Sequence, residues 1–284
     1  MAKKSLFAQT RREVDAPVTK EEVARTMEAL PTGKQPGPNR IPNELYKYMS
    51  SVFAPLMAEL MNSTRRKGTL PKHFMEGDIS MLYKKGPREN PKNYRPITLL
   101  NTDYKVLTRV LARRMLKTVH EFVDGAQKGF VPDVFIAEAT QMLRLVEAHI
   151  NEEPEERQGI FLFLDMEKAF DRVSYDFINK GLEAVGFGKH FRNMIHLIYD
   201  PDKPPKRRMY INGYLSDWFH IHSGVAQGCP ISPLLFLLVG QALKVTIEQE
   251  KGIKGIKLNK LVFKTLQFAD DTTILSRSTK ELPH

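Results

Sequence analysis

Two adjacent acids, Asp270 and Asp271, interrupt an apolar and β-branched stretch, QFADDTTIL, at residues 267–275. Flanking residues of this kind favour a β-strand, and two like charges beside a buried strand are unfavourable unless something compensates them. The acids are therefore expected at the tight turn of a hairpin over 260–278, where both side chains reach one side. Taken alone, such a pair is more typical of a solvated turn than of a site.

A third acid ends another predicted strand. Residues 160–164, IFLFL, are five consecutive apolar residues, which predicts a strand buried on both faces, and Asp165 follows it directly. If this strand lies beside the hairpin, three carboxylates meet at one sheet edge. Clustered carboxylates raise one another's pKa unless a cation intervenes, and Mg²⁺ prefers such oxygen ligands. The pattern predicts a site for two divalent ions about 3.5–4 Å apart.

Helices and hairpins are intermixed along the rest of the chain. A capping box of Thr19 and Glu22 predicts a helix over 19–30. A helix over 44–66 is expected to kink or break at Pro55. Asn212-Gly213 predicts a type I′ hairpin turn. Further strands are expected at 78–86 and before 101, and further helices over 103–123, 136–150, 175–185, 189–199 and after 231. Antiparallel hairpins among helices predict an α+β fold rather than a doubly wound parallel sheet.

The positive charge of the chain is concentrated in its first half. The net charge is +10; residues 1–125 contain 23 Lys and Arg against 13 Asp and Glu, whereas residues 126–284 contain 20 of each. Within 65–117 the count is 14 against 4. A basic half joined to a neutral half indicates a surface for a polyanion such as nucleic acid, and a solvated surface without a partner explains the charge equally well.

Other features of the composition bound the class of protein. The single cysteine, Cys229, excludes an internal disulfide and fits a reducing compartment inside the cell, nucleus or cytoplasm. The basic start of the chain is followed by no apolar run, so no signal peptide is expected. The longest charge-free run, 223–243, contains two prolines and is interpreted as a buried core segment, so no membrane span is expected.

Several segments together resemble, in order and spacing, the motifs of reverse transcriptases. FLDMEKAFDRVS at 163–174, GVAQGCPISPLLF at 224–236 and FADDTTIL at 268–275 resemble the palm motifs. LYKKGPRENPKNYRPITLLN at 82–101 and QKGF at 127–130 resemble the fingers motifs. With the proline-rich segment at 33–47, the set is similar to the polymerases of non-LTR (LINE-type) retrotransposons. The similarity runs from about residue 20 to residue 278.

This resemblance implies a right-hand polymerase fold and a domain organisation. It implies an N-terminal extension over 1–60, fingers over 61–150 and a palm over 151–284, with a fingers-side insertion near 175–222. His284 follows Asp271 by 13 residues, so the primer grip and thumb of the family are expected to be absent from this chain. The implied activity is RNA-directed DNA polymerisation, in which a DNA primer on an RNA template is extended with dNTPs. Two Mg²⁺ ions are implied, and Mn²⁺ can substitute.

The resemblance also assigns candidate site residues. Asp165, Asp270 and Asp271 are expected to hold the metals, with the backbone carbonyl of Met166 as a further ligand. Phe170 corresponds to the steric gate that excludes a ribose 2′-hydroxyl, although its spacing alone fits core packing. The remaining candidates contact the nucleotide: Gln227 and Gly228 below the incoming base, and Lys84, Lys85 and Arg95 at the triphosphate. Arg95 is the strongest of these three because a guanidinium binds phosphate in a bidentate manner.

Departures from the family pattern leave alternatives open. Asp133-Val134 stands where relatives often have Gly-Arg, and Asn39-Arg40 stands where Asp-Gly is usual. A catalytically incompetent retrotransposon remnant, which at most binds nucleic acid, is one alternative. An RNA-dependent RNA polymerase shares the three-carboxylate chemistry, but Phe170 and the fingers motifs argue against it. Template preference and oligomeric state are not predicted.

Overall fold

A computed structural model of the chain describes residues 5–152, 159–258 and 261–278. The chain divides into two compact units. Unit 1 comprises Met1–Ser5, Thr118–Ala169 and Pro233–His284, and unit 2 comprises Leu6–Lys117 and Phe170–Ser232. Because residues 170–232 belong to the same unit as residues 6–117, the units do not coincide with the expected segments 1–60, 61–150 and 151–284. The names fingers and palm therefore stay a prediction.

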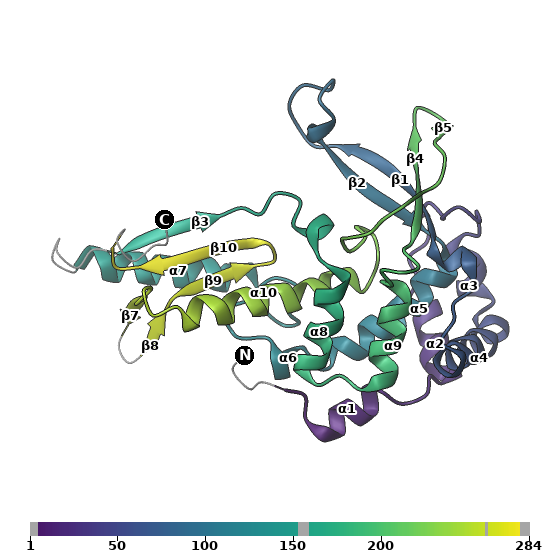
Figure 1. Cartoon of the computed structure of the whole chain (residues 1–284), viewed down its shortest axis with the longest axis horizontal. Helices are drawn as coiled ribbons and strands as arrows, with labels where there is room; N and C mark the ends of the chain where they lie inside the picture. The colour runs from purple at the N-terminus through teal and green to yellow at the C-terminus, as the bar shows by residue number, and fades with distance from the viewer. Residues whose placement is uncertain (1–4, 153–158, 259–260, 279–284) are drawn as a thin grey trace. The chain divides into compact units, whose positions relative to one another are not determined.

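Unit 1 is built around a small antiparallel sheet. Its strand order is β3 (Ile160–Leu164), β10 (Asp271–Ser276) and β9 (Thr265–Phe268), and a separate pair is formed by β7 (Ile256–Leu258) and β8 (Leu261–Phe263). The pairing of β10 with both neighbours confirms the predicted hairpin and the predicted position of strand 160–164 beside it. The helices of this unit are α6 (Val119–Phe122), α7 (Ile136–Glu152) and α10 (Ser232–Gln249) (Figure 1).

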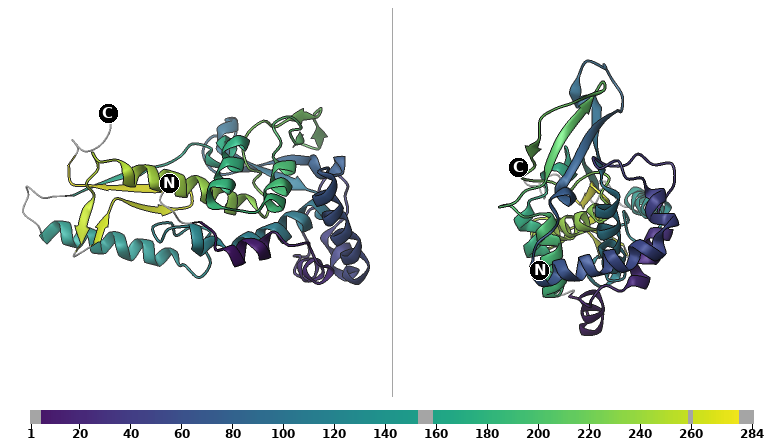
Figure 2. Two further views of the ribbon diagram at one scale, coloured as in Figure 1. Left: turned by 60° about the horizontal axis from the view of Figure 1, so that its bottom comes forward. Right: turned by 90° about the vertical axis from the view of Figure 1, so that its right-hand side faces the viewer.

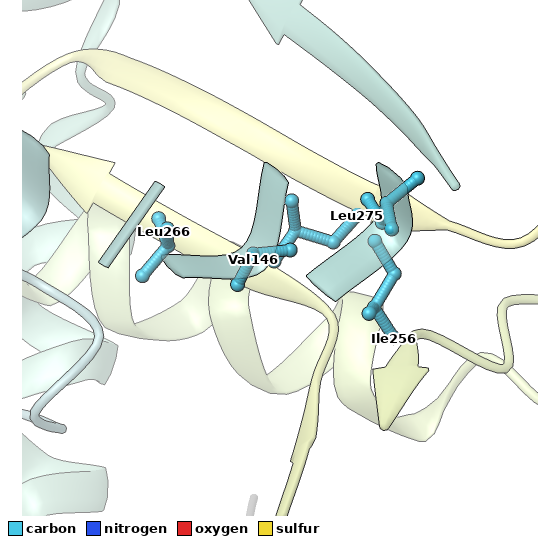
Figure 3. Packing of buried hydrophobic residues seen from close by; sticks show 5 residues of the cluster. Val146, Ile256, Leu266 and Leu275 are labelled. Carbon is cyan, nitrogen blue, oxygen red and sulfur yellow. The ribbon is translucent and has the colours of Figure 1, made fainter. Parts of the chain in front are cut away.

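The core of unit 1 covers both faces of the central strand β10. Leu275 packs with Val146, Ile150, Ile256 and Leu266, a cluster that joins α7 to the sheet (Figure 3). The preceding residue of β10, Ile274, packs in a second cluster with Ile253 and with Ile247 near the end of α10. Successive side chains of a strand point to opposite faces, so two adjacent apolar residues anchor the strand that begins with Asp271.

The expectation that strand 160–164 is buried on both faces was wrong. β3 is partly exposed along its length, and Phe163 is 69% exposed. The reason is its place in the sheet: among the described residues, β3 is an edge strand of unit 1 with β10 as its one partner strand. An apolar run predicts a strand, but a central or edge position depends on partners that are distant in the sequence.

Unit 2 contains a mixed sheet with the strand order β2, β1, β4, β5, in which β6 also pairs with β4. The antiparallel pair of β1 (Glu76–Tyr83) and β2 (Tyr94–Leu100) confirms the strands predicted there. The type I′ turn is also confirmed, because Asn212 (φ +51°) and Gly213 (φ +87°) both adopt left-handed conformations. The other strands are β4 (Lys206–Ile211), β5 (Tyr214–Leu215) and β6 (Phe219–His220), with β4 parallel to β1.

Figure 2 shows two further views of the ribbon, in which the first helices of unit 2 are coloured purple to blue. The bounds of the unit 2 helices agree with most predicted ranges. The predicted helix 44–66 is two helices, and the break falls at Met49, whereas Pro55 is accommodated inside the second helix. The predicted helix 103–123 likewise ends at Leu116. The α-helices are α1 (Ala8–Val14), α2 (Lys20–Glu28), α3 (Asn43–Tyr48), α4 (Ser50–Lys67), α5 (Thr102–Leu116), α8 (Tyr175–Val185) and α9 (Lys189–Ile198), with short 3₁₀ turns at Lys72–Met75, Pro91–Asn93 and Ala169–Arg172.

The predicted capping box at α2 is half right. Thr19 accepts a hydrogen bond from the Glu22 N–H at 3.2 Å, as a cap requires. The Glu22 carboxylate, however, accepts two hydrogen bonds from the buried guanidinium of Arg114, at 2.8 and 2.7 Å. A bidentate, charge-assisted pair is stronger than a bond to a neutral amide, so the long-range partner prevails over the local one.

The apolar segment after residue 231 forms α10, as predicted. Its residues Leu234, Leu235, Phe236, Leu237 and Leu238 are buried. Across the described part of the chain, no helix combines the length and the apolar character needed to cross a membrane.

Candidate active site

The two adjacent acids lie at the tip of the β9–β10 hairpin in unit 1. Asp271 pairs with Phe268, so Ala269 and Asp270 form a two-residue turn between the strands. Ala269 adopts a left-handed conformation with φ +56°, which is uncommon for a residue with a side chain. The sequence predicted the turn but not this conformation of Ala269.

Asp165 lies next to this tip because of the strand register. β3 and β10 are antiparallel, their pairing ends with Leu164 opposite Thr272, and Asp165 and Asp271 are the next residues along the two segments. Both Asp165 and Asp270 lie close enough to the Asp271 carboxyl to act on it electrostatically. The structure therefore brings together the three carboxylates that were predicted to share one sheet edge.

The electrostatics of the tip reflect this clustering. Partial burial, then Asp270, then Asp165 raise the pKa of the Asp271 carboxyl above its ordinary value of 3.8. Within the part of the chain that the structure describes, no salt bridge or side-chain hydrogen bond to Asp165, Asp270 or Asp271 is present. The cluster is thus a site of negative charge that the described residues do not neutralise.

The donor set fits a divalent cation, although the side chains are not arranged as a complete ligand set. Carboxylate oxygens are the ligands that Mg²⁺ prefers. Among the described residues, no group of three or more His, Cys, Asp or Glu side chains is positioned to hold a metal by itself. Mg²⁺ commonly uses one or two carboxylates and completes its shell with water and substrate phosphates. Met166 directly follows Asp165 and is half-buried, and the role of its carbonyl stays a prediction.

In unit 2 the structure joins Phe170 to the loop that contains Gln227 and Gly228. The Val225 N–H donates to the Phe170 carbonyl at 2.8 Å, and the Gly224 N–H donates to the Val173 carbonyl at 2.7 Å. These bonds tie the 3₁₀ turn at Ala169–Arg172 to the start of the loop. Phe170 is half-buried, and its predicted role as a steric gate is not tested by these contacts.

The loop residues Gln227 and Gly228 lie against β2. The Thr98 N–H donates to the Gln227 carbonyl at 2.8 Å. Gly228 has φ +108°, and a Cβ there would lie 2.7 Å from the Thr98 carbonyl oxygen. Glycine is therefore required by close approach to β2, a reason distinct from the predicted approach of a nucleotide. Gln227 also lines a cavity of about 350 Å³ in unit 2, together with Thr98, Asp171, Arg207 and His222.

The three predicted triphosphate ligands all lie on or beside the β1–β2 hairpin. Lys84, Lys85 and Arg95 are exposed. The Lys84 N–H donates to the Asn93 carbonyl at 2.8 Å and closes the loop between the strands, and Arg95 is opposite Leu82. Their side chains are thus presented to solvent on a single hairpin of unit 2.

One residue near the acids was missed by the interpretation of the sequence. Gln127, in the QKGF segment, is buried in unit 1 and contacts the Ala269–Asp270 turn. The signal that could have drawn attention to it is the pairing of a glutamine with Gly129 two residues later, since a buried amide and a required glycine both indicate close backbone contact.

Comparison with known proteins identifies the family. A profile described as "Reverse transcriptase (RNA-dependent DNA polymerase)" matches residues 82–284, well over half of the chain. The chain belongs to this family. The family's divalent-metal dependence agrees with the donor set at the acidic tip.

Relatives with similar sequences come from mobile elements. The chain is 27% identical over 274 residues to the transposon TX1 uncharacterized 149 kDa protein of Xenopus laevis. This match covers 95% of this chain and 20% of that protein. It is 29% identical to the type-1 R2 Pol polyprotein of Popillia japonica, over 76% of this chain and 30% of the relative. It is 25% identical to the RNA-directed DNA polymerase from mobile element jockey of Drosophila melanogaster, over 92% of this chain and 28% of the relative. The chain thus spans less than a third of the length of these relatives.

A solved structure supports the fold. The apo telomerase of Candida tropicalis, truncated from the C-terminal domain, superimposes with a TM-score of 0.51 and 12% identity, covering 82% of this chain and 50% of that one. At this identity the likeness concerns the fold alone. It confirms the expected α+β, right-hand polymerase fold.

Proposed function

We propose that this reverse transcriptase chain carries out RNA-directed DNA synthesis, adding dNTPs to the 3′-hydroxyl of a DNA primer on an RNA template. The observation that supports this proposal is the clustering of Asp165, Asp270 and Asp271 at the end of the paired strands β3 and β10. Three clustered carboxylates with no counter-ion among the described residues suit a phosphoryl-transfer site that acts through metal ions.

Asp165 and Asp270 would hold two Mg²⁺ ions, with Asp271 as a further carboxylate and Mn²⁺ as a substitute. When bound, such ions stabilise the negative charge on the attacking and leaving oxygens of an in-line displacement. The contribution of the chain is to hold the carboxylates on the end of a packed sheet, which Ile274 and Leu275 anchor from both faces. Preorganised groups of this kind need no rearrangement at the moment of reaction.

The candidates in unit 2 would bind the nucleotide and the nucleic acid. Arg95, with Lys84 and Lys85, would contact the triphosphate, and Phe170 with Gln227 and Gly228 would contact the sugar and base. The strong positive charge of segment 65–117 would bind the sugar–phosphate backbone without reading its sequence. We propose fingers over 61–150 and a palm over 151–284 as the functional names of these regions.

Primer extension by the 284-residue chain tests the proposal. The chain, Asp270→Asn and Asp176→Asn are compared on poly(rA)–oligo(dT) with dTTP and Mg²⁺ or Mn²⁺. Asp176 is an exposed aspartate of α8 paired with Lys180, so it is a matched control for the loss of one charge. Extension is expected from the chain and Asp176→Asn, with a loss of at least about 100-fold in Asp270→Asn, as is usual when a charge-stabilising group is removed.

A chain that extends primers no better than Asp270→Asn would contradict the proposed activity. Salt-sensitive binding of the RNA–DNA duplex without extension would then support the alternative of a remnant that binds nucleic acid. Incorporation of rUTP in preference to dTTP would instead favour an RNA polymerase.

A further inference from the structure

The turn that carries Asp270 is held by a buried glutamine of unit 1. The Gln127 side chain is 2% exposed. Its Oε1 accepts hydrogen bonds from the Ala269 N–H at 3.0 Å and from the Gly129 N–H at 2.8 Å. Its Nε2 donates to the Ala269 carbonyl at 3.2 Å. A single carboxamide therefore binds both backbone polar groups of Ala269.

The backbone around Gln127 is fixed against the same hairpin. The Gln267 N–H donates to the Ala126 carbonyl at 2.9 Å, and the Lys128 N–H donates to the Gln267 carbonyl at 2.8 Å. A Cβ at Gly129 would clash with the Ala269 amide nitrogen. A Cβ at Gly240 of α10 would lie 3.0 Å from the Gln127 Nε2. The amide is thus enclosed by β9, α10 and its own segment, and its orientation is determined.

This contact acts on the strained position of the turn. Ala269 has φ +56°, and two-residue hairpin turns that need a positive φ at this position favour glycine. An alanine keeps such a conformation only where its surroundings over-determine it, and such residues cluster at functional sites. The hydrogen bonds from Gln127 provide that constraint, one residue before Asp270.

We propose that Gln127 is a positioning residue for the acidic site. By holding Ala269 in the left-handed conformation, it sets where Asp270 and Asp271 lie relative to Asp165. Glutamine suits this role because it carries a donor and an acceptor on one planar group. Glutamate can accept both N–H bonds but cannot donate to the Ala269 carbonyl, and asparagine is one methylene shorter.

The experiment compares Gln127→Met with Gln267→Met in the full chain. Gln267 is a matched control because it is also 2% exposed and lies in β9, but its side chain donates to Gly240 and Thr272 instead of to the turn. Two measurements are made: amide hydrogen exchange at Ala269, and Mn²⁺ affinity by electron paramagnetic resonance. Gln127→Met is expected to lose exchange protection at Ala269 and to bind Mn²⁺ about 10-fold more weakly, as is usual for outer-shell partners. The Mn²⁺ affinity of Gln267→Met is expected to stay within about threefold of that of the unmodified chain, since this variant leaves the hydrogen bonds between Gln127 and Ala269 in place.

The kinetic part of the experiment rests on the proposed function. Gln127→Met is expected to lower kcat by about 10–100-fold, while KM for dTTP changes by less than about threefold, because misplaced carboxylates impair chemistry more than nucleotide binding. Ala269→Gly is expected to reduce the effect of Gln127→Met, since glycine adopts the positive φ unaided.

An unchanged Mn²⁺ affinity in Gln127→Met, or an equal loss in both methionine variants, would overturn the proposal. If Gln127→Met does not fold, Gln127→Asn takes its place with the same expectations. If the chain extends no primer at all, the proposed activity fails, whereas the exchange and Mn²⁺ measurements still decide the role of Gln127.

Discussion

The two units treat clustered charges in opposite ways. In unit 2 the buried Arg114 donates to both carboxylate oxygens of Glu22 and to the carbonyls of Val14, Ala16 and Pro17. In unit 1 the acidic tip, Asp165, Asp270 and Asp271, has no counter-ion among the described residues. The first cluster satisfies its charge internally, whereas the described residues of the second do not.

This difference distinguishes charges that stabilise the fold from charges that are costly to the fold. A buried ion is retained for structure only when its partners and hydrogen bonds are complete. A cluster of like charges at a strained turn destabilises the chain that carries it, and such clusters are typical of functional sites. The contrast predicts opposite effects of neutralising mutations in the two units.

The largest expected effect comes from breaking the satisfied cluster. Arg114→Met leaves Glu22 without its partner and three carbonyls without a donor, so the free energy of unfolding should fall by about 3–5 kcal/mol. Urea unfolding followed by circular dichroism measures this change.

The matched control is Arg66→Met, which removes an arginine–glutamate pair with a single close contact on the surface of α4. Arg66 and Glu59 are 2.6 Å apart with side chains 62% and 69% exposed, and the expected change is below about 1 kcal/mol. Equal losses of unfolding free energy in Arg114→Met and Arg66→Met would contradict the prediction that the buried cluster stabilises the chain more than an exposed pair does.

At the acidic tip, a neutralising mutation should raise the stability of the chain instead of lowering it. The raised pKa of Asp271 means that its contribution to stability is complete below pH 3.8 and is lost as the pH rises through its value in the folded chain. Asp271→Asn removes this loss, so the metal-free variant should melt at a higher temperature than the unmodified chain at neutral pH. The two should converge below pH 3.8. Thermal melts across this pH range test the prediction, and a difference independent of pH would contradict it.

The smallest effect distinguishes the two neighbours of Asp271. Asp270 contributes more than Asp165 to the raised pKa of the Asp271 carboxyl. Asp270→Asn should therefore lower this pKa further than Asp165→Asn does, as measured by carboxyl ¹³C chemical shifts in the absence of metal. The reverse order would show that the Asp165 carboxylate interacts more strongly with Asp271 than its neighbour Asp270 does, and would contradict the prediction.

Much of the local structure could be predicted because it depends on neighbours in the sequence. Asn212-Gly213 has the conformational freedom that a type I′ turn requires, and Thr19 caps a helix with its own hydroxyl. The adjacent acids between apolar strands were expected at a hairpin turn, and they lie there. Each of these features is decided within about four residues, where propensity and capping rules apply.

Other features depended on residues far apart in the chain. Glu22 was expected to complete its local cap, but Arg114, 92 positions away, binds it instead. Residues 160–164 were expected to be buried on both faces, but their single partner strand leaves Phe163 exposed. Gly228 was linked to a nucleotide, and the structure shows the additional requirement set by Thr98.

By itself the sequence determined the α+β pattern, the reverse transcriptase motifs and the identity of the three carboxylates. These depend on local order and on residue type, which a chain carries without folding. Only the tertiary structure decided that Asp165 lies near Asp271, that Ala269 holds a left-handed turn, and that Gln127 binds it from a distance of 142 positions. Strand register and buried side-chain contacts arise when distant segments pack together, and no rule of local spacing specifies them.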